Sequence, residues 1–260
     1  MTYLVIDLET VPDLSRWVPP ADKPDAFAPH WAQQIACVGY FVMSNDYQAA
    51  SIGSIVAATQ GDERSLIDSL SRMVASHRPT IVTFNGRSFD LPVIAYRALL
   101  HGVQLPWYYR NRDVRYRYSE DGHLDLCDSL SDYGASTKAP LDALAKLIGL
   151  PGKVGVDGSQ VAELFADGRH DEIERYCLAD VAQTALLLLR YRLIQGALKH
   201  AEHDAARIAL VEWFRRDPRL SVFAAPAMVS DVAIGAGSQP DSRRAGGVPV
   251  SGDLSFAESA

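Results

Sequence analysis

A chain of 260 residues in which 48% are hydrophobic can bury a substantial core, so it suits one large domain or two small ones. Its formal net charge of −7 argues against a nucleic-acid binder that works through bulk positive charge, although a local basic patch remains compatible with it. Cys37, Cys127 and Cys177 are too scattered for a paired zinc motif, and no apolar run has the length of a membrane span, so we expect a cytoplasmic protein without disulfides.

The first half of the chain predicts the antiparallel start of a sheet. Residues 3–10 form an apolar strand-like run, and the prolines of residues 12–31 predict a long surface loop. Two β-type runs joined by a short polar connection predict a hairpin over residues 35–57. The helical spacing of apolar residues over 62–77 predicts a helix with Asp62 as its N-cap.

The second half alternates between strand and helix patterns. The expected elements are a buried strand at 80–85, a helix at about 89–100, a short strand at 123–128, two small helices at 141–148 and 160–165, and a long helix from about 171 to 198. Together with the antiparallel start, they predict an α/β domain with a mixed sheet flanked by helices. We expect this domain to occupy residues 1–200, an accessory helix residues 201–217, and a small, polar, flexible tail residues 218–260.

Two acids stand two positions apart at the end of the first strand. Side chains alternate across a strand, so Asp7 and Glu9 would share one face. An isolated pair of this kind is most often a strand end that reaches solvent. The functional alternative is a pair of hard oxygen ligands for a divalent cation, which requires further carboxylates from elsewhere in the chain.

Two later segments offer such carboxylates. In "NGRSFD" a sharp turn at Asn85 would aim Asp90 at the strand ends, although capping of the following helix would explain the same residues. In "YCLADV" Tyr176 and Asp180 are four residues apart and share one face of a helix, although a half-buried tyrosine beside a solvated acid would give the same pattern. Each segment is a weak signal alone.

In combination the motifs run D-x-E, N-x-x-x-F-D and Y-x-x-x-D, and in that order they resemble the DEDD superfamily of 3′-to-5′ exonucleases, which has the ribonuclease H-like fold. Tyr176 resembles the tyrosine of the DEDDy branch, which includes the proofreading domain of B-family DNA polymerases. The branch with a catalytic histidine is disfavoured, because Arg175 holds that position. The stretches "NGRSFDLPV", "HLDLCD", "GLPGK" and "YCLADV" are similar to predicted exonucleases related to that polymerase domain, over roughly residues 1–195.

The resemblance implies that Asp7, Glu9, Asp90 and Asp180 bind two divalent cations, Mg²⁺ or Mn²⁺. The chemistry of the residues agrees, because converging carboxylates repel one another without cations and oxygen ligands suit hard ions. Such cations would activate the attacking water and stabilise the leaving 3′ oxygen, and the product would be a nucleoside monophosphate. Tyr176, with an ordinary pKa of about 10, is a poor base at neutral pH, so we expect it to orient the attacking water.

The segment "WYYRNRDVRYRY", residues 107–118, interleaves four arginines with five aromatic residues. Guanidinium groups bind phosphates and rings stack on bases, which is how single strands are held without sequence readout. An exposed hairpin whose rings cover the edge of the core would show the same composition. The expected substrate-binding residues are Asn85, Arg87, Phe89, Arg110, Arg112, Arg115 and Arg117, with Lys138 and Lys153 as further candidates.

Three other residues near these motifs are expected to have structural roles. Asp125 and Asp128 are expected to cap a turn rather than line the site, and Cys177 is expected to face away from Tyr176 and to contribute packing.

The leading hypothesis is a metal-dependent 3′-to-5′ exonuclease acting on single-stranded nucleic acid, with DNA favoured over RNA. One alternative is a catalytically inactive domain of the same fold that only binds nucleic acid. The presence of all four acids and the tyrosine argues against that alternative. A second alternative is an interaction module whose tail recruits a replication or repair complex, which deletion of the tail would test.

Overall fold

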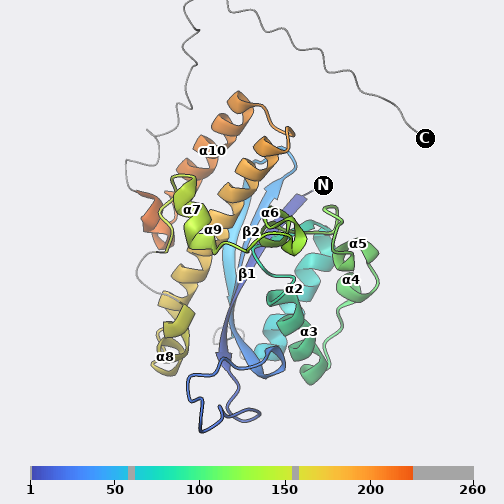
Figure 1. Ribbon diagram of the computed structural model, residues 1–260, viewed down its shortest axis with the longest axis vertical. Helices are drawn as coiled ribbons and strands as arrows, with labels where there is room; N and C mark the ends of the chain where they lie inside the picture. Colours follow the sequence, from blue (N-terminus) through green and yellow to red (C-terminus); the bar gives the residue numbers. More distant parts are fainter. Residues whose placement is uncertain (1, 58–61, 154–157, 225–260) are drawn as a thin grey trace, which may run out of the picture.

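The computed structural model describes residues 2–57, 62–153 and 158–224, so most of the expected tail lies outside the described residues. Within these residues, five strands form one mixed sheet in the order β3-β2-β1-β4-β5 (Figure 1). The strands are β1 (Thr2–Pro12), β2 (Gln33–Ser44), β3 (Ala49–Val56), β4 (Thr80–Thr83) and β5 (His123–Asp125). The first three pair antiparallel, and β4 and β5 then add parallel to β1. The predicted mixed sheet, including its hairpin, is confirmed.

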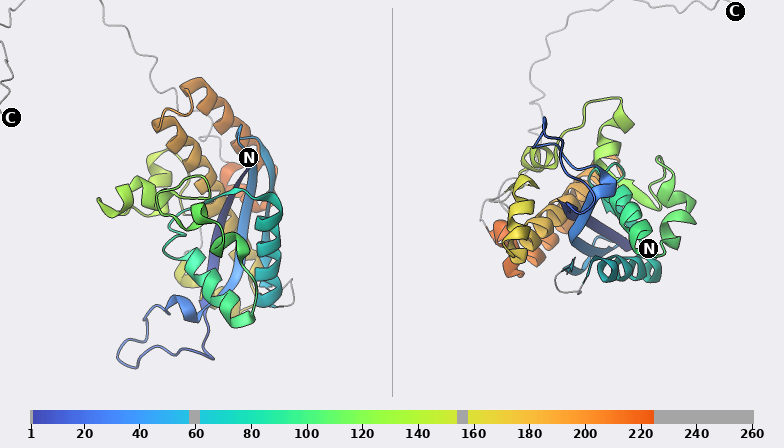
Figure 2. Two further views of the ribbon diagram at one scale, coloured as in Figure 1. Left: turned by 90° about the vertical axis from the view of Figure 1, so that its right-hand side faces the viewer. Right: turned by 90° about the horizontal axis from the view of Figure 1, so that it is seen from below.

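Helices cover both faces of this sheet (Figures 1 and 2). On one face, the side chains of Leu4, Ile6 and Leu8 pack against α2 (Glu63–His77) and α3 (Asp90–His101). On the other face, the alternate residues of β1 face α9 (His170–Ile194) and α10 (His200–Phe214), which supply much of a second core cluster. The sheet therefore separates two apolar layers, and the odd-numbered residues of β1 point towards α9.

The remaining helices are short. They are α4 (Pro106–Tyr109), α5 (Arg112–Arg115), α6 (Leu126–Leu130), α7 (Leu141–Leu147) and α8 (Val161–Ala166), with 3-10 helices at η1 (His30–Ala32), η2 (Asp132–Gly134), η3 (Gly158–Gln160) and η4 (Pro218–Ala224). The arginine-rich segment thus contains two short helices, and the hairpin alternative is wrong. Asp62 caps α2 as predicted, since its carboxylate accepts the backbone N–H of Ser65 at 2.6 Å.

A buried ion network anchors α2, α3 and the long loop after β1. The Glu63 carboxylate accepts the backbone N–H of Ile35 at 2.7 Å and also pairs with Arg97 of α3. Arg97 in turn reaches the carboxylate of Asp13 at 2.8 Å. Because all three charged groups are buried, the loss of any one of them would leave another uncompensated. The network therefore fixes α3 relative to the end of β1.

The C-terminal part of the described chain extends the core further than the sequence indicated. The tail was expected from residue 218, but η4 forms there and buries both Leu220 and Phe223 completely. The ring of Phe223 lies 5.6 Å from that of Phe214 in α10, measured between centroids. Two isolated apolar residues give no periodic signal, which is why the predicted tail starts too early. None of the helices described is long and apolar enough to cross a membrane.

Candidate active site

Asp7 and Glu9 lie on the face of β1 that points towards α9, as the alternation of strand side chains predicts. Their carboxylate oxygens and the Cys177 Sγ lie within 4.8 Å of one another. The pairing of β1 with β2 shifts register between Glu9 and Thr10, directly after the second acid. Bulges of this kind occur next to active sites, where they redirect a side chain.

A glycine on β2 lets α9 approach these two acids closely. Gly39 is the register partner of Asp7, and its backbone N–H donates to the Cys177 Sγ at 3.1 Å. A Cβ at this position would lie 2.8 Å from that sulfur and 3.0 Å from the Val181 Cγ2. The close approach brings the helix that carries Asp180 against β1.

The same approach corrects the prediction for Cys177, which was expected to face elsewhere. Its Sγ lies 3.4 Å from the backbone oxygen of Asp7 and 3.8 Å from the Asp7 Oδ2. The prediction considered only the helical angle from Tyr176, and that angle does not show how near the helix lies to the strand. Burial raises the pKa of the Cys177 thiol, which therefore stays protonated at neutral pH.

Asp90 is the first residue of α3 and is only 4% exposed. The backbone N–H of Leu8, the residue between Asp7 and Glu9, lowers the pKa of Asp90, so the start of α3 lies close to the acidic end of β1. The Asp90 Oδ1 is buried and has no hydrogen-bond partner. An unpaired buried carboxylate oxygen is costly unless a cation or a proton satisfies it.

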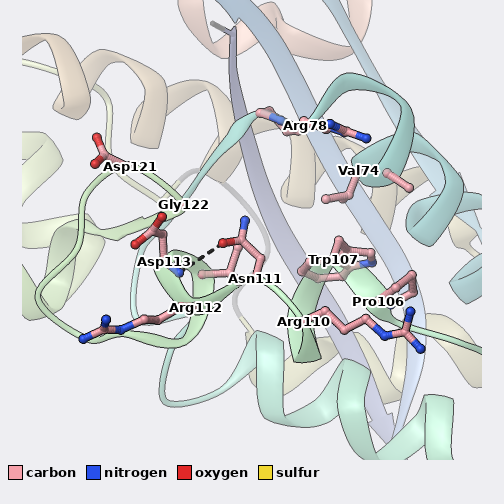
Figure 3. Close-up of a pocket in the computed structure, with 13 residues that line it drawn as sticks. Val74, Arg78, Pro106, Trp107, Arg110, Asn111, Arg112, Asp113, Asp121 and Gly122 are labelled. Atoms are coloured by element: carbon pink, nitrogen blue, oxygen red, sulfur yellow. Dashed lines mark hydrogen bonds between the residues drawn. The ribbon is translucent and has the colours of Figure 1, made fainter.

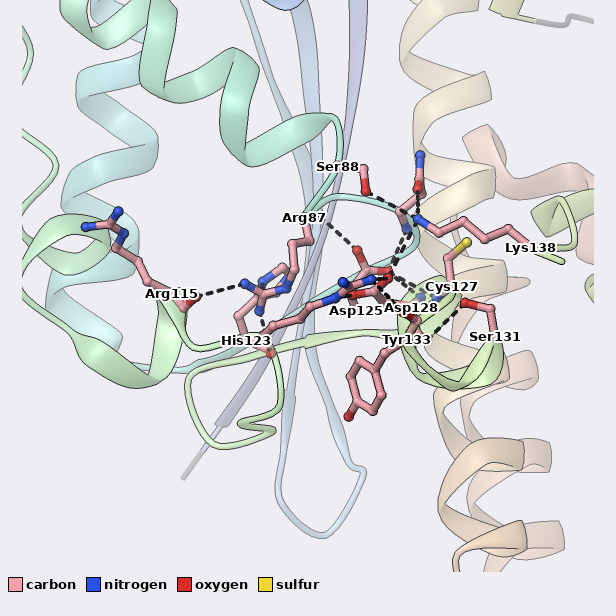
Figure 4. A network of polar contacts seen from close by, with 12 residues as sticks. Arg87, Ser88, Arg115, His123, Asp125, Cys127, Asp128, Ser131, Tyr133 and Lys138 are labelled. Carbon is pink, nitrogen blue, oxygen red and sulfur yellow. Dashed lines mark hydrogen bonds and ion pairs between the residues drawn. The ribbon is translucent and has the colours of Figure 1, made fainter. Parts of the chain in front are cut away.

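Asp125, at the end of β5, holds the turn that leads to Asp90 (Figure 4). Its Oδ1 accepts the backbone N–H of Asn85 at 2.8 Å, and its Oδ2 accepts that of Arg87 at 2.8 Å. The same carboxylate caps α6 through the N–H groups of Cys127 and Asp128, at 3.0 and 3.2 Å. The predicted capping role is confirmed for Asp125, and the clamp on the turn is an addition that sequence did not indicate.

The four acids of the motifs share an electrostatically unfavourable environment. Burial, followed by the charges of neighbouring carboxylates, raises the pKa values of Asp7 and Glu9 well above their usual range. Burial raises the pKa of Asp90 to about 7 and that of Asp180 to about 6. The charges of Asp90 and Asp180 also raise the pKa of Asp7, so the structure brings the acids of β1, α3 and α9 together. Such a cluster favours a bound cation.

Tyr176 and Lys153 lie beside these acids. The pKa of Tyr176 is raised by burial and then by the charges of Asp180, Glu9 and Asp7, so its hydroxyl stays protonated at neutral pH. Tyr176 in turn lowers the pKa of Asp180, so the two side chains lie close together. The charge of Lys153 lowers the pKa values of both Glu9 and Asp180, which places its ammonium group near the cluster.

Two of the predicted substrate-binding arginines are engaged within the protein (Figure 4). The Arg87 guanidinium donates to the backbone oxygen of Arg115 at 3.2 Å and contacts the His123 Nδ1 at 3.0 Å. Arg117 donates twice to Asp128, at 2.7 Å each. Because Asp128 is only 2% exposed, this arginine neutralises a buried charge, and it is a poor candidate for holding a phosphate.

The other predicted substrate-binding residues fall into two groups. Near the acids, Asn85 accepts a hydrogen bond from the Lys138 Nζ at 3.0 Å, and the Phe89 ring lies 5.4 Å from that of His30. Arg110 and Arg112, in contrast, line a pocket at the opposite end of β4, next to the residues that precede β4 and β5. Arg115, exposed on α5, has its guanidinium 5.5 Å from the Tyr109 ring.

Sequence reasoning missed Gly39 and the clamp made by Asp125. A glycine inside an apolar strand is a signal for close backbone approach, so Gly39 could have been recognised. The clamp depends on the pairing of β4 with β5, which places Asp125 opposite Thr83, and local sequence carries no signal for that register.

A comparison with protein families decides the classification. A family model described as a predicted 3′-5′ exonuclease related to the exonuclease domain of PolB matches residues 25–225. The chain belongs to that family. The match includes Asp90, Tyr176 and Asp180, whereas Asp7 and Glu9 precede it, so their assignment rests on the geometry described above.

A solved structure of another protein has the same fold. The family B DNA polymerase from the hyperthermophilic archaeon Pyrobaculum calidifontis matches with a TM-score of 0.54 and 20% identity, over 86% of this chain and 27% of that one. At this identity the likeness shows the fold alone, and it confirms the ribonuclease H-like exonuclease fold.

Weaker matches are to exonuclease I. Its product-bound structure matches with a TM-score of 0.41 and 12% identity, over 75% of this chain and 48% of that one. The Escherichia coli enzyme in complex with a 5cy-dT13 oligonucleotide matches with a TM-score of 0.36 and 13% identity, over 65% of this chain and 41% of that one. The family member described here thus spans only 27–48% of these three proteins. No curated protein sequence matches it.

Proposed function

We propose that this family member is a metal-dependent 3′-to-5′ exonuclease that hydrolyses the terminal phosphodiester bond of single-stranded nucleic acid, DNA in preference to RNA, and releases nucleoside monophosphates. One observation carries the proposal. Three separate elements bring four acids together: Asp7, Glu9, Asp90 and Asp180. Burial raises the pKa values of all four, and the charges of neighbouring carboxylates raise those of Asp7 and Glu9 further. A fold that keeps such a cluster gains stability only when positive charge is bound there.

The residues present fit two divalent cations of the Mg²⁺ or Mn²⁺ type. The buried Asp90 Oδ1 lacks a hydrogen-bond partner, and the four acids supply oxygen ligands, which hard cations prefer. Cys177 is a soft donor beside them, and burial keeps it a thiol. When bound, the cations would supply Lewis acidity that makes water a stronger nucleophile and stabilises the leaving oxygen.

The remaining residues would position the substrate and the water. Tyr176 is protonated at neutral pH, so its hydroxyl acts as a hydrogen-bond donor that orients the attacking water rather than as a base. Two ammonium groups would attract the phosphates next to the scissile bond. They are those of Lys153, beside the acids, and of Lys138, which donates to Asn85.

We assign the nuclease activity to residues 1–200, with residues 201–217 as an accessory helix that shares the same core. Recruitment of replication or repair proteins through the tail stays a prediction, because residues 225–260 lie outside those described. A cytoplasmic location also stays a prediction.

The test is incubation of the purified full chain with 5′-end-labelled single-stranded DNA and RNA in Mg²⁺, Mn²⁺ or EDTA. We expect a ladder of products shortened from the 3′ end, release of mononucleotides, and no product in EDTA. Release of the 5′ label as the first product, or cleavage that persists in EDTA, would contradict the proposal. Binding without cleavage in both metals would favour the inactive nucleic-acid-binding domain.

A further inference from the structure

A pocket of about 660 Å³ lies at the N-terminal ends of β4 and β5 (Figure 3). Arg78 at the end of α2, Arg110 after α4, and Arg112 of α5 line it. In the part of the chain that the structure describes, the side chains of Arg78 and Arg110 have neither a hydrogen bond nor an ion pair. Cations without protein partners in a concave site are suited to an anionic ligand.

The walls of the pocket differ in charge. Figure 3 shows Trp107 between Arg78 and Arg110, with Asp113 and Asp121 on the other side. Trp107 is fixed from behind, because its Nε1 donates to the Ser71 Oγ at 3.2 Å. An anion is therefore expected on the side of the two unpaired arginines.

A row of contacting side chains leads from the acids towards this pocket. Its first part starts at Asn85, on the turn before Asp90, where the Lys138 Nζ lies 3.0 Å from the Asn85 Oδ1 and 3.7 Å from the Asp128 carboxylate. Asp128 binds Arg117, whose guanidinium lies 6.0 Å from the centre of the Tyr133 ring.

The second part of the row consists of tyrosines. The ring of Tyr133 lies 4.6 Å from that of Tyr118, which lies 5.7 Å from that of Tyr116. Tyr118 and Tyr116 are 57% and 48% exposed. The Arg112 guanidinium lies 5.7 Å from the Tyr116 ring, and Arg112 lines the pocket. The row therefore runs from Asn85, on the turn before Asp90, to Arg112 at the edge of the pocket.

The two ends of the row are far enough apart for several nucleotides. The acids lie beyond the C-terminal end of β4, whereas Pro79, which lines the pocket, precedes that strand. A strand rises about 3.3 Å per residue, so the two sites are roughly 15 Å or more apart.

We infer that a single strand of nucleic acid runs from the acids over Tyr133, Tyr118 and Tyr116, and that the pocket of Arg78, Arg110 and Arg112 binds its backbone phosphates. The inference rests on the proposed function for the identity of the ligand. Exposed rings stack on bases of any sequence, and guanidinium groups bind phosphates, so the combination suits an unpaired strand. It adds Arg78 and the three tyrosines to the expected binding residues and removes Arg117, which binds Asp128.

The binding test uses the full chain in EDTA and compares a fluorescent trinucleotide with a long single-stranded DNA. The double variant Arg78→Ala/Arg110→Ala should bind the long strand about tenfold more weakly, as expected for the loss of two phosphate contacts, and should bind the trinucleotide normally. For the long strand, the slope of log affinity against log salt concentration should become shallower by about 1.4, at about 0.7 for each lost phosphate contact. Arg72→Ala is the matched control and should leave both affinities unchanged, since Arg72 is an exposed arginine of α2 that contacts Asp68 and Ser69 of its own helix.

Variants of the tyrosines provide a second binding test. Tyr116→Leu/Tyr118→Leu should weaken binding of the long strand without changing the salt slope, because stacking releases no counterions. In hydrolysis, the arginine double variant should raise KM for the long strand and leave kcat and the trinucleotide unaffected.

Three results would overturn the inference: unchanged affinity for the long strand, equal losses for both lengths, or loss of mononucleotide binding by the double variant while long-strand binding is retained. The last result would make the pocket a site for free nucleotides. If the wild-type chain hydrolyses no substrate, the proposed function fails, yet the EDTA binding series still decides whether the path exists.

Discussion

At the residue scale, the Tyr176 hydroxyl lies beside two charged systems, the Asp180 carboxylate and the acids of β1. Their charges and its burial raise its pKa above the ordinary value, so it can donate a hydrogen bond at neutral pH but cannot remove a proton from water. This separates its role from that of the acids.

Tyr176→Phe should therefore lower kcat by about ten- to a hundredfold and leave KM nearly unchanged. Loss of one positioning hydrogen bond costs about 1–3 kcal/mol, which transition-state arithmetic converts to that range. Steady-state kinetics across neutral to alkaline pH would measure the effect, and both proteins should show the same alkaline limb. A loss as large as that caused by removing a metal-binding acid would indicate a more direct role for the hydroxyl.

Asp125 has an indirect, positioning role, because it accepts hydrogen bonds from the backbone of Asn85 and Arg87 and touches no reacting atom. Asp125→Asn replaces one accepting oxygen by an amide that cannot accept, which leaves at least one N–H of the clamp unpaired. We expect a loss of about 1–3 kcal/mol in the free energy of unfolding. We also expect weaker Mn²⁺ binding by calorimetry, because the turn leads to Asp90.

Asp46→Asn is the control for this variant, since Asp46 is exposed in the turn between β2 and β3. Equal behaviour of the two variants in both measurements would show that Asp125 has no positioning role.

At the scale of elements, the contact between α9 and β2 decides whether Tyr176 and Asp180 reach the acids of β1. Gly39→Ala would place a Cβ 2.8 Å from the Cys177 Sγ and 3.3 Å from the backbone oxygen of Cys177. Overpacking of this kind costs about 1–3 kcal/mol, and the displacement of α9 should also weaken Mn²⁺ binding.

Thermal unfolding and calorimetry would measure both effects, with Gly158→Ala as the control, because a Cβ at Gly158 meets no atom within 4 Å. Adding Cys177→Ala to Gly39→Ala should restore part of the stability, since it removes the nearest atom. A Gly39→Ala protein with wild-type stability and metal affinity would show that the close approach is unimportant.

The elements also show what sequence could predict. Periodicity and caps predicted the sheet, α2 with its Asp62 cap, and the long helix α9, because these signals are local. The arginine-rich segment was not predictable, since Arg117 pairs with Asp128 and Arg87 with His123 only after β4 and β5 are aligned. The four acids could be inferred as a set from motif order, whereas the proximity of Cys177 depends on how closely two elements pack.

At the scale of the whole molecule, the acid cluster should make the stability of the metal-free protein depend on pH. The pKa of Asp90 is raised from 3.8 to about 7, so the folded protein keeps its proton after the unfolded chain has released it. The stability that this protonation contributes is fully present below about pH 4 and is lost as the pH rises to about 7. Asp180, with a pKa of about 6, contributes in the same direction.

Between pH 5 and 7 in EDTA, the melting temperature of the wild type should therefore fall relative to that of Asp90→Asn, because the variant lacks one titrating group. His123, whose pKa burial lowers from 6.5 to about 3, contributes in the opposite direction over that interval, but it is present in both proteins and cancels in the comparison. Added Mn²⁺ should raise the melting temperature more at pH 7 than at pH 5, since binding requires deprotonated carboxylates. A difference in melting temperature between the wild type and Asp90→Asn that stays constant over this range, or a metal effect that is larger at pH 5, would show that the cluster does not behave as described.

The most direct test of the central claim, that these acids form a metal-dependent nuclease centre, is hydrolysis of 5′-labelled single-stranded DNA by Asp7→Asn beside the wild type in Mn²⁺. Asp7→Asn removes one ligand charge and relieves repulsion from Glu9, Asp90 and Asp180, so the variant should fold and should melt in EDTA at the wild-type temperature or above. The account predicts that this folded variant loses hydrolysis while the wild type shortens the strand from its 3′ end. A folded Asp7→Asn protein that cleaves within a few-fold of the wild-type rate would contradict it.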